Sequence, residues 1–167
     1  VASTLAATLD GARMSLTFAS AETPPCPLHI VTKESLPDWR QAQPDAVQTW
    51  LDTNGFSAGF GQVLMLPDGT GRASSAIAGL GSVTALPRHR FALGKIQAAL
   101  PDGTYAIETH PEDLDLAEQS LGWLLSQYRF DRYASQSEAG AQLIAPEGGD
   151  AAFRTLCRPD ACKEMET

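Results

Sequence analysis

The sequence PEDLDLAEQSLGWLLSQY at residues 111–128 carries the clearest secondary-structure signal in the chain. Three acidic residues, Glu112, Asp113 and Asp115, stand in its first turn, where the helix dipole favours negative charge. Apolar residues follow at the spacing of three and four that marks one face of a helix. The segment is therefore predicted to be the main core helix. Its expected apolar face consists of Leu114, Ala117, Leu121, Leu124, Leu125 and Tyr128.

Trp123 lies away from this face, about 160° around the helix from Leu125 at about 100° per residue. A large aromatic side chain in that position either packs on a second layer or is exposed as the anchor of an interface. We expect contact with a partner domain or a neighbouring subunit. The candidate interface residues are Trp123, Tyr128, Phe130 and Tyr133.

Four shorter elements are predicted in the first half of the chain. The run PLHIVT at 27–32 is apolar and contains β-branched residues, which favours a buried strand. Residues 45–54 form a helix, with Asp45 as its N-cap and a glycine directly after its end. The runs QVLML at 62–66 and ASSAIA at 73–78 flank a Pro-Asp-Gly turn, so they are predicted to form a hairpin.

Three further elements complete the pattern. A helix is expected with Pro87 in its first turn and an apolar stripe that runs from Phe91 to Leu100. An alternating strand is expected over 104–108 and a last strand over 141–145. Strands and helices therefore interleave in the order β-α-β-β-α-β-α-β. This order predicts an α/β fold, a single domain with a mixed β-sheet flanked by helices.

The expected domain occupies residues 27–134. Residues 1–26 are interpreted as a loose N-terminal extension. Within it, Met14 begins a segment that reads as a natural start, so residues 1–13 are interpreted as upstream sequence that contributes little to the fold. Residues 135–167 are interpreted as a linker, the last strand and a run-up to a domain that is missing. The pattern is lost near Thr155, and we expect a truncation or a frame shift there.

Composition excludes several classes of partner. The chain has 167 residues, 43% of them hydrophobic, which suffices for one core. Its net charge of −8 and its 12 scattered basic residues argue against binding to nucleic acid or to an anionic membrane. No window approaches the roughly 18 apolar residues of a membrane span. We therefore expect a cytoplasmic protein.

No catalytic, cofactor-binding or metal-binding residue is predicted. His29, His89 and His110 are isolated, and no nucleophile-elbow motif is present. The three cysteines give an odd count, which favours reduced thiols. Cys157 and Cys162 lack the further ligands of a zinc site.

Two clusters invite a functional interpretation. The sequence GLGS at 79–82 resembles an anion-binding loop, but Thr84 stands where the dinucleotide fingerprint needs a third glycine, so a turn is favoured. The one dense acidic cluster is explained by its position near a helix N-terminus. Its members are Glu108, Glu112, Asp113, Asp115 and Glu118.

Six segments between Leu36 and Tyr133 resemble the N-terminal domain of the leucine aminopeptidase, or cytosol aminopeptidase, family. The segments are LPDW, WLDTNGF, QVLMLPDGTG, AGLGS, ALPDGTYAIE and LGWLLSQYRFDRY. The most specific are Gly122-Trp123 with the aromatic residues after it, and Leu100-Pro101-x-Gly103-x-Tyr105. A serine, Ser126, stands where relatives are expected to have glycine.

This resemblance implies the macro-domain-like, non-catalytic part of a two-metal exopeptidase that removes N-terminal amino acids from peptides. The metals, zinc or manganese, and the catalytic motifs would belong to the missing C-terminal catalytic domain. No activity is expected from this chain alone, and its role would be packing against that domain and within a homo-oligomer. The alternative is a macro-like module that binds ADP-ribose or a related nucleotide, although the expected diphosphate loop is absent.

Overall fold

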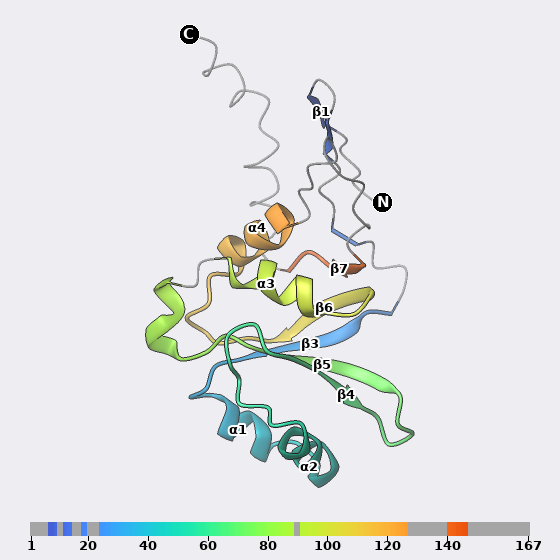
Figure 1. Ribbon diagram of the computed structural model, residues 1–167, viewed down its shortest axis with the longest axis vertical. Coiled ribbons are helices and arrows are strands. Elements are labelled where there is room, and N and C mark those ends of the chain that lie inside the picture. Colours follow the sequence, from blue (N-terminus) through green and yellow to red (C-terminus); the bar gives the residue numbers. More distant parts are fainter. Residues whose placement is uncertain are drawn as a thin grey trace.

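A five-stranded mixed sheet forms the centre of the molecule (Figure 1). The computed structural model describes residues 7–9, 12–14, 18–19, 24–88, 91–126 and 140–146. The strands are β3 (Cys26–Val31), β4 (Val63–Pro67), β5 (Ala73–Gly79), β6 (Gly103–Thr109) and β7 (Ala141–Leu143), in the order β4-β5-β3-β6-β7. β4 is antiparallel to β5, and the other pairs are parallel. The predicted α/β class with a mixed sheet is confirmed.

Helices cover both faces of this sheet (Figure 1). The first pair is α1 (Leu36–Gln41) and α2 (Asp45–Thr53), and the second is α3 (Ala92–Ala99) and α4 (Leu116–Ser126). A 3₁₀ helix, η1 (Val83–Arg88), precedes α3. Two short strands, β1 (Ala7–Leu9) and β2 (Ala12–Met14), form a separate antiparallel pair. No helix in the described ranges is both long enough and apolar enough to span a membrane.

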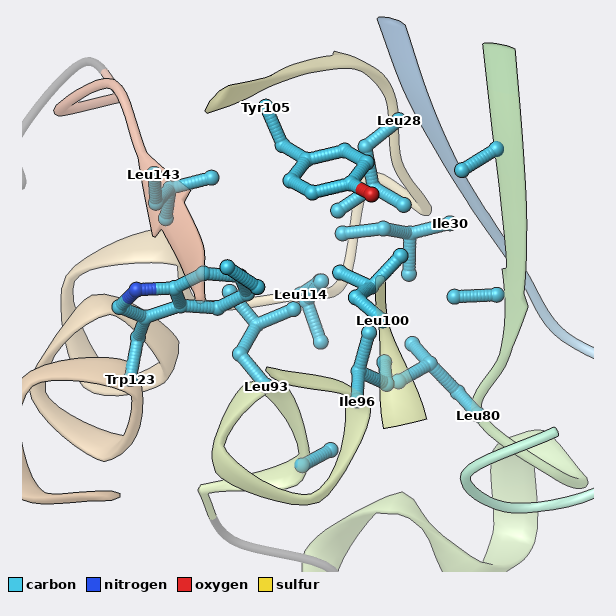
Figure 2. Packing of buried hydrophobic residues seen from close by; sticks show 14 residues of the cluster. Leu28, Ile30, Leu80, Leu93, Ile96, Leu100, Tyr105, Leu114, Trp123 and Leu143 are labelled. Carbon is cyan, nitrogen blue, oxygen red and sulfur yellow. The ribbon is translucent and has the colours of Figure 1, made fainter. Parts of the chain in front are cut away.

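Two hydrophobic clusters lie on opposite faces of the sheet. The larger cluster joins β3, β5, β6 and β7 to α3 and α4, and Figure 2 shows Leu28 and Ile30 of β3 packed within it. The smaller cluster includes Val31 of β3 with Leu51 of α2. Side chains of a strand alternate between the two faces, so β3 supplies both clusters.

The helices α3 and α4 approach each other closely through two glycines. A Cβ atom added to Gly94 would lie 2.9 Å from the Gly122 carbonyl oxygen, and one added to Gly122 would lie 2.5 Å from Cβ of Phe91. Real Cβ atoms are essentially never found closer than 3.0 Å to such neighbours. The helix crossing therefore requires glycine at position 122, in the Gly-Trp pair that marks the family resemblance.

Polar side chains also fix α4 against its neighbours. The backbone N–H of Leu93 donates to Oε1 of the buried Gln119 at 3.2 Å. The buried Gln97 donates through Nε2 to the Ala141 carbonyl oxygen at 3.2 Å and accepts through Oε1 from Ser126 Oγ. One amide side chain of α3 thus links the end of α4 to the start of β7.

The predicted phase and start of this last helix were wrong. α4 begins at Leu116, and Oδ1 of Asp115 accepts from the backbone N–H groups of Ala117 and Glu118. The face that includes Gln119, Ser120, Trp123 and Leu124 is buried, whereas Leu125 is 43% exposed. The prediction failed because it assumed that polar residues lie on the surface of the helix, whereas α4 buries Gln119 and Ser120.

Two further segments differ from the expected pattern. The segment LPDW, for which no helix was predicted, begins α1, where Pro37 occupies a position in the first turn that tolerates proline. Within the expected N-terminal extension, Phe18 packs against the larger cluster and the Ala19 N–H donates to the Leu143 carbonyl oxygen at 2.8 Å. These two residues therefore contact the domain.

The neighbouring leucines of α4 provide a matched test of its orientation. Leu124→Ala should lower the free energy of unfolding by about 2–5 kcal/mol, because its side chain is fully buried. Leu125→Ala should cost well under about 1 kcal/mol, because that side chain is largely exposed. Denaturant unfolding of both variants measures the difference. Equal losses would contradict the observed phase of the helix.

Candidate functional site

The carboxyl ends of the parallel strands are the first place to look for a ligand site. Open α/β sheets bind ligands there, where neighbouring strands send their connections to opposite faces. In this chain β3 continues to α1 and α2 on one face, whereas β5 continues through η1 to α3 on the other. The candidate glycine loop, residues 79–82, follows β5 at this position.

The backbone N–H groups of the glycine loop are used within the protein. Gly79 donates to the Gln62 carbonyl oxygen at 2.8 Å, Leu80 to that of Val31 at 2.9 Å, and Gly81 to that of Ala58 at 2.9 Å. A phosphate loop needs such groups directed at the ligand. The arrangement therefore favours the interpretation of these residues as a structural turn.

The glycines in this loop allow a second segment to pack on them. A Cβ atom at Gly79 would lie 2.4 Å from the carbonyl carbon of Ala58. Ala58 is itself fully buried and has a positive φ of 52°, which L residues other than Asn and Asp rarely adopt. The segment 55–62 is thus pressed onto the end of β5.

The side chain of Gln62 holds this segment in shape. Its Oε1 accepts from the N–H groups of Ser57 and Gly59, both at 3.1 Å, and its Nε2 donates to the Gly55 carbonyl oxygen at 3.2 Å. At the tip, Nζ of Lys95 lies 4.6 Å from the centre of the Phe60 ring. Segment 55–62 is therefore fixed by contacts within the domain.

A carboxylate of the chain accepts a backbone hydrogen bond directly after the glycine loop. Oε2 of Glu34 accepts from the Val83 N–H, at the start of η1, at 3.0 Å. Glu34 follows β3, and Val83 follows the glycine loop. A bound phosphate at this point would be repelled by Glu34, which argues against the nucleotide-binding alternative.

The histidines make contacts that do not require a catalytic role. Nδ1 of His29 lies 3.1 Å from Oγ1 of Thr109, and its ring packs against Trp39. Burial lowers the pKa of His29, although the charge of Glu108 acts in the opposite direction. Nδ1 of the exposed His110 lies 3.0 Å from the Pro111 carbonyl oxygen. His89 lies outside the described residues.

The helix N-terminus explains the acidic cluster only in part. Asp115 caps α4 and Glu118 lies in its first turn, whereas Glu112 and Asp113 precede the helix and Glu108 belongs to β6. Within the described ranges, no group of three or more His, Cys, Asp or Glu residues could hold a metal ion. Burial raises the pKa of the Cys26 thiol. Cys157 and Cys162 lie outside the described residues.

The expectation of an exposed Trp123 was wrong. Its side chain has no exposed area and belongs to the larger cluster, where Figure 2 shows the indole beside Leu93 and Leu143. The buried face of α4 contains the polar residues Gln119 and Ser120 together with Trp123. Tyr128, Phe130 and Tyr133 lie outside the described residues, so their candidate interface role stays a prediction.

Comparison with known proteins identifies the family of this domain. The family model described as "M17 aminopeptidase, N-terminal domain" matches residues 26–146. The chain belongs to the M17 aminopeptidase family. The M17 match covers all five strands of the sheet and all four α-helices. The resemblance to cytosol aminopeptidases is thereby confirmed, and no curated protein matches at a significant level.

Solved structures show the same fold in longer chains. The cytosol aminopeptidase from Coxiella burnetii has 21% identity and a TM-score of 0.69, and the match covers 82% of this M17 chain and 30% of that one. The bottromycin maturation enzyme BotP in complex with Mn has 22% identity and a TM-score of 0.52, with 80% and 29% covered. The M17 chain therefore spans about 30% of the length of the first of these.

Alanine substitutions at two glycines test whether Gly79 is required for close packing or only for a turn. Gly79→Ala should destabilise the domain by about 1–3 kcal/mol or more, because its Cβ would overlap the backbone of segment 55–62. Gly69→Ala is the control, since no heavy atom lies within 4 Å of its Cβ position, and it should change stability by less than about 0.5 kcal/mol. Thermal unfolding of both variants tests the packing. A Gly79→Ala domain as stable as the control would contradict it.

Proposed function

We propose that this M17 N-terminal domain serves as a packing domain of a leucine aminopeptidase-like metallo-exopeptidase. In that role it would contact the catalytic part of the parent chain and neighbouring subunits of a homo-oligomer. The observation that carries the proposal is the family match over residues 26–146 in a chain that spans only about 30% of a cytosol aminopeptidase. The parent would act in the cytoplasm and remove N-terminal amino acids from peptides.

The use of polar groups inside the domain supports a packing role. The N–H groups of the glycine loop, the Gln62 amide and the Glu34 carboxylate all bond to other parts of the domain. These groups are satisfied without a ligand. The two divalent metals expected of the parent, zinc or manganese, would be bound by residues beyond this domain. One structural relative was solved with Mn, which agrees with that metal class.

An activity assay of the chain alone tests the non-catalytic part of this proposal. The purified chain should show no hydrolysis of leucyl substrates with added zinc or manganese, because two-metal catalysis needs a full ligand set. Calorimetric titration with ADP-ribose should show no binding, because the N–H groups of Gly79, Leu80 and Gly81 already bond within the domain and Glu34 adds a negative charge beside them. Metal-dependent turnover that a chelator abolishes would refute the first expectation. Saturable binding of ADP-ribose would support the alternative nucleotide-binding function instead.

Expression of a longer gene product tests the packing role. The reading frame would first be sequenced beyond codon 167, and the extended protein expressed with and without residues 1–146. Removing the domain should reduce the oligomer size by light scattering, because subunit contacts would be lost. A deletion protein with unchanged oligomer size and stability would contradict the proposal. Leu125→Ala within the full protein is the control for a change that leaves the fold intact.

A further inference from the structure

The helix α1 is weakly attached to the rest of the domain. None of its residues is fully buried, and only Leu36 and Trp39 pack against the smaller cluster. Arg40 Nη2 and Asp52 Oδ2 of α2 form a salt bridge of 2.6 Å, but their side chains are 38% and 59% exposed. Exposed ion pairs contribute little to stability. The contact of Trp39 with the sheet is therefore a main attachment of α1.

A titratable group lies under this attachment. The rings of Trp39 and His29 are 5.2 Å apart between centroids and tilted by 53°. His29 belongs to the central strand β3 and is half-buried, with Nδ1 3.1 Å from Oγ1 of Thr109 on β6. The imidazole thus contacts the Trp39 indole of α1 and the Thr109 hydroxyl of β6.

The charged groups around His29 do not compensate for protonation. Glu108 on β6 attracts a positive charge at this position, but it is exposed, and the loss of water around the ring has the larger effect on the pKa. On α1, Asp38 and Arg40 flank Trp39 and have opposite charges. The residue that pairs with His29 on β5 is Ile77, which does not titrate. Burial therefore favours the neutral imidazole.

We propose that protonation of His29 releases α1 from the sheet, so that α1 acts as an acid-sensitive latch over the smaller hydrophobic cluster. An imidazolium has two N–H donors; Thr109 Oγ1 lies within reach of Nδ1, and Nε2 needs water. Attraction between a cation and the Trp39 ring opposes the release, whereas the loss of water around the ring favours it. Water gains access when Trp39 moves away. Opening would uncover the side of the smaller cluster that contacts Leu36.

The pH range of the effect follows from the direction of the shift. The pKa of His29 is lowered while α1 is packed. The proposal requires this pKa to return toward its ordinary value of about 6.5 when α1 is open. Above about pH 6.5 both states hold a neutral ring, and opening does not depend on pH. As the pH falls below that value, the opening constant should rise about tenfold per pH unit until the lower pKa is reached.

Hydrogen exchange of α1 tests the latch directly. The reporters are the hydrogen-bonded amides of Leu36, Trp39 and Ala42, measured from pH 7.5 to 5.5 and corrected for intrinsic exchange. Their opening constant should rise with acid, whereas amides in β3 should keep their protection. His29→Gln should remove the pH dependence, and the exposed His110→Gln should retain it.

A measurement on the unmodified chain tests the proposal even if the His29→Gln variant does not fold. In an NMR titration, the midpoint of the His29 ring shift should coincide with the midpoint of the changes in the α1 amides. An α1 opening constant that is flat between pH 7.5 and 5.5 would overturn the proposal. The same pH dependence in a folded His29→Gln protein would overturn it too.

Discussion

The central strand β3 must fill both faces of the sheet at once, and the rest of the domain is arranged around that constraint. Its neighbours on both sides are parallel strands, so each requires a crossover connection, and the helices of these connections cover both faces. Leu28 and Ile30 are buried under α3 and α4, and Val31 is buried toward α2. The register shift between Leu28 and His29 lies in the middle of this strand, beside the Trp39 contact of α1.

Close backbone contact is the second feature that the domain depends on. Gly122 lets α4 cross α3, and Gly79 lets segment 55–62 lie against the end of β5. The N–H groups of Gly79, Leu80 and Gly81 bond within the domain at the carboxyl edge of the sheet, where related topologies bind ligands. Membership of the M17 family and the internal use of these groups both support the proposed packing role.

Sequence reasoning located elements with strong local signals and was wrong where tertiary contacts decide. The helix α2 ends at Thr53 before Asn54 and Gly55, as predicted, and the Pro-Asp-Gly turn joins β4 to β5. The predicted N-cap was wrong, because Pro44 is the N-cap and Asp45 is the first helical residue, with no side-chain capping bond. The predicted orientation of α4 was wrong. Gln119 is a buried residue that accepts from the Leu93 N–H, and this bond between two helices leaves no mark in the local sequence. For the candidate site, the sequence indicated a turn at the glycines, but no local pattern could show that Glu34 would meet Val83, 49 residues away.

The most direct test of the packing role is a comparison of hydrogen exchange between this chain alone and the longer protein that would contain it. The account predicts added protection in the longer protein at surface amides within residues 24–146, while the amides of β3 stay equally protected in both. Such a footprint would identify the face that meets the rest of the parent. Identical exchange throughout residues 24–146 in the two proteins would contradict a packing function for the domain.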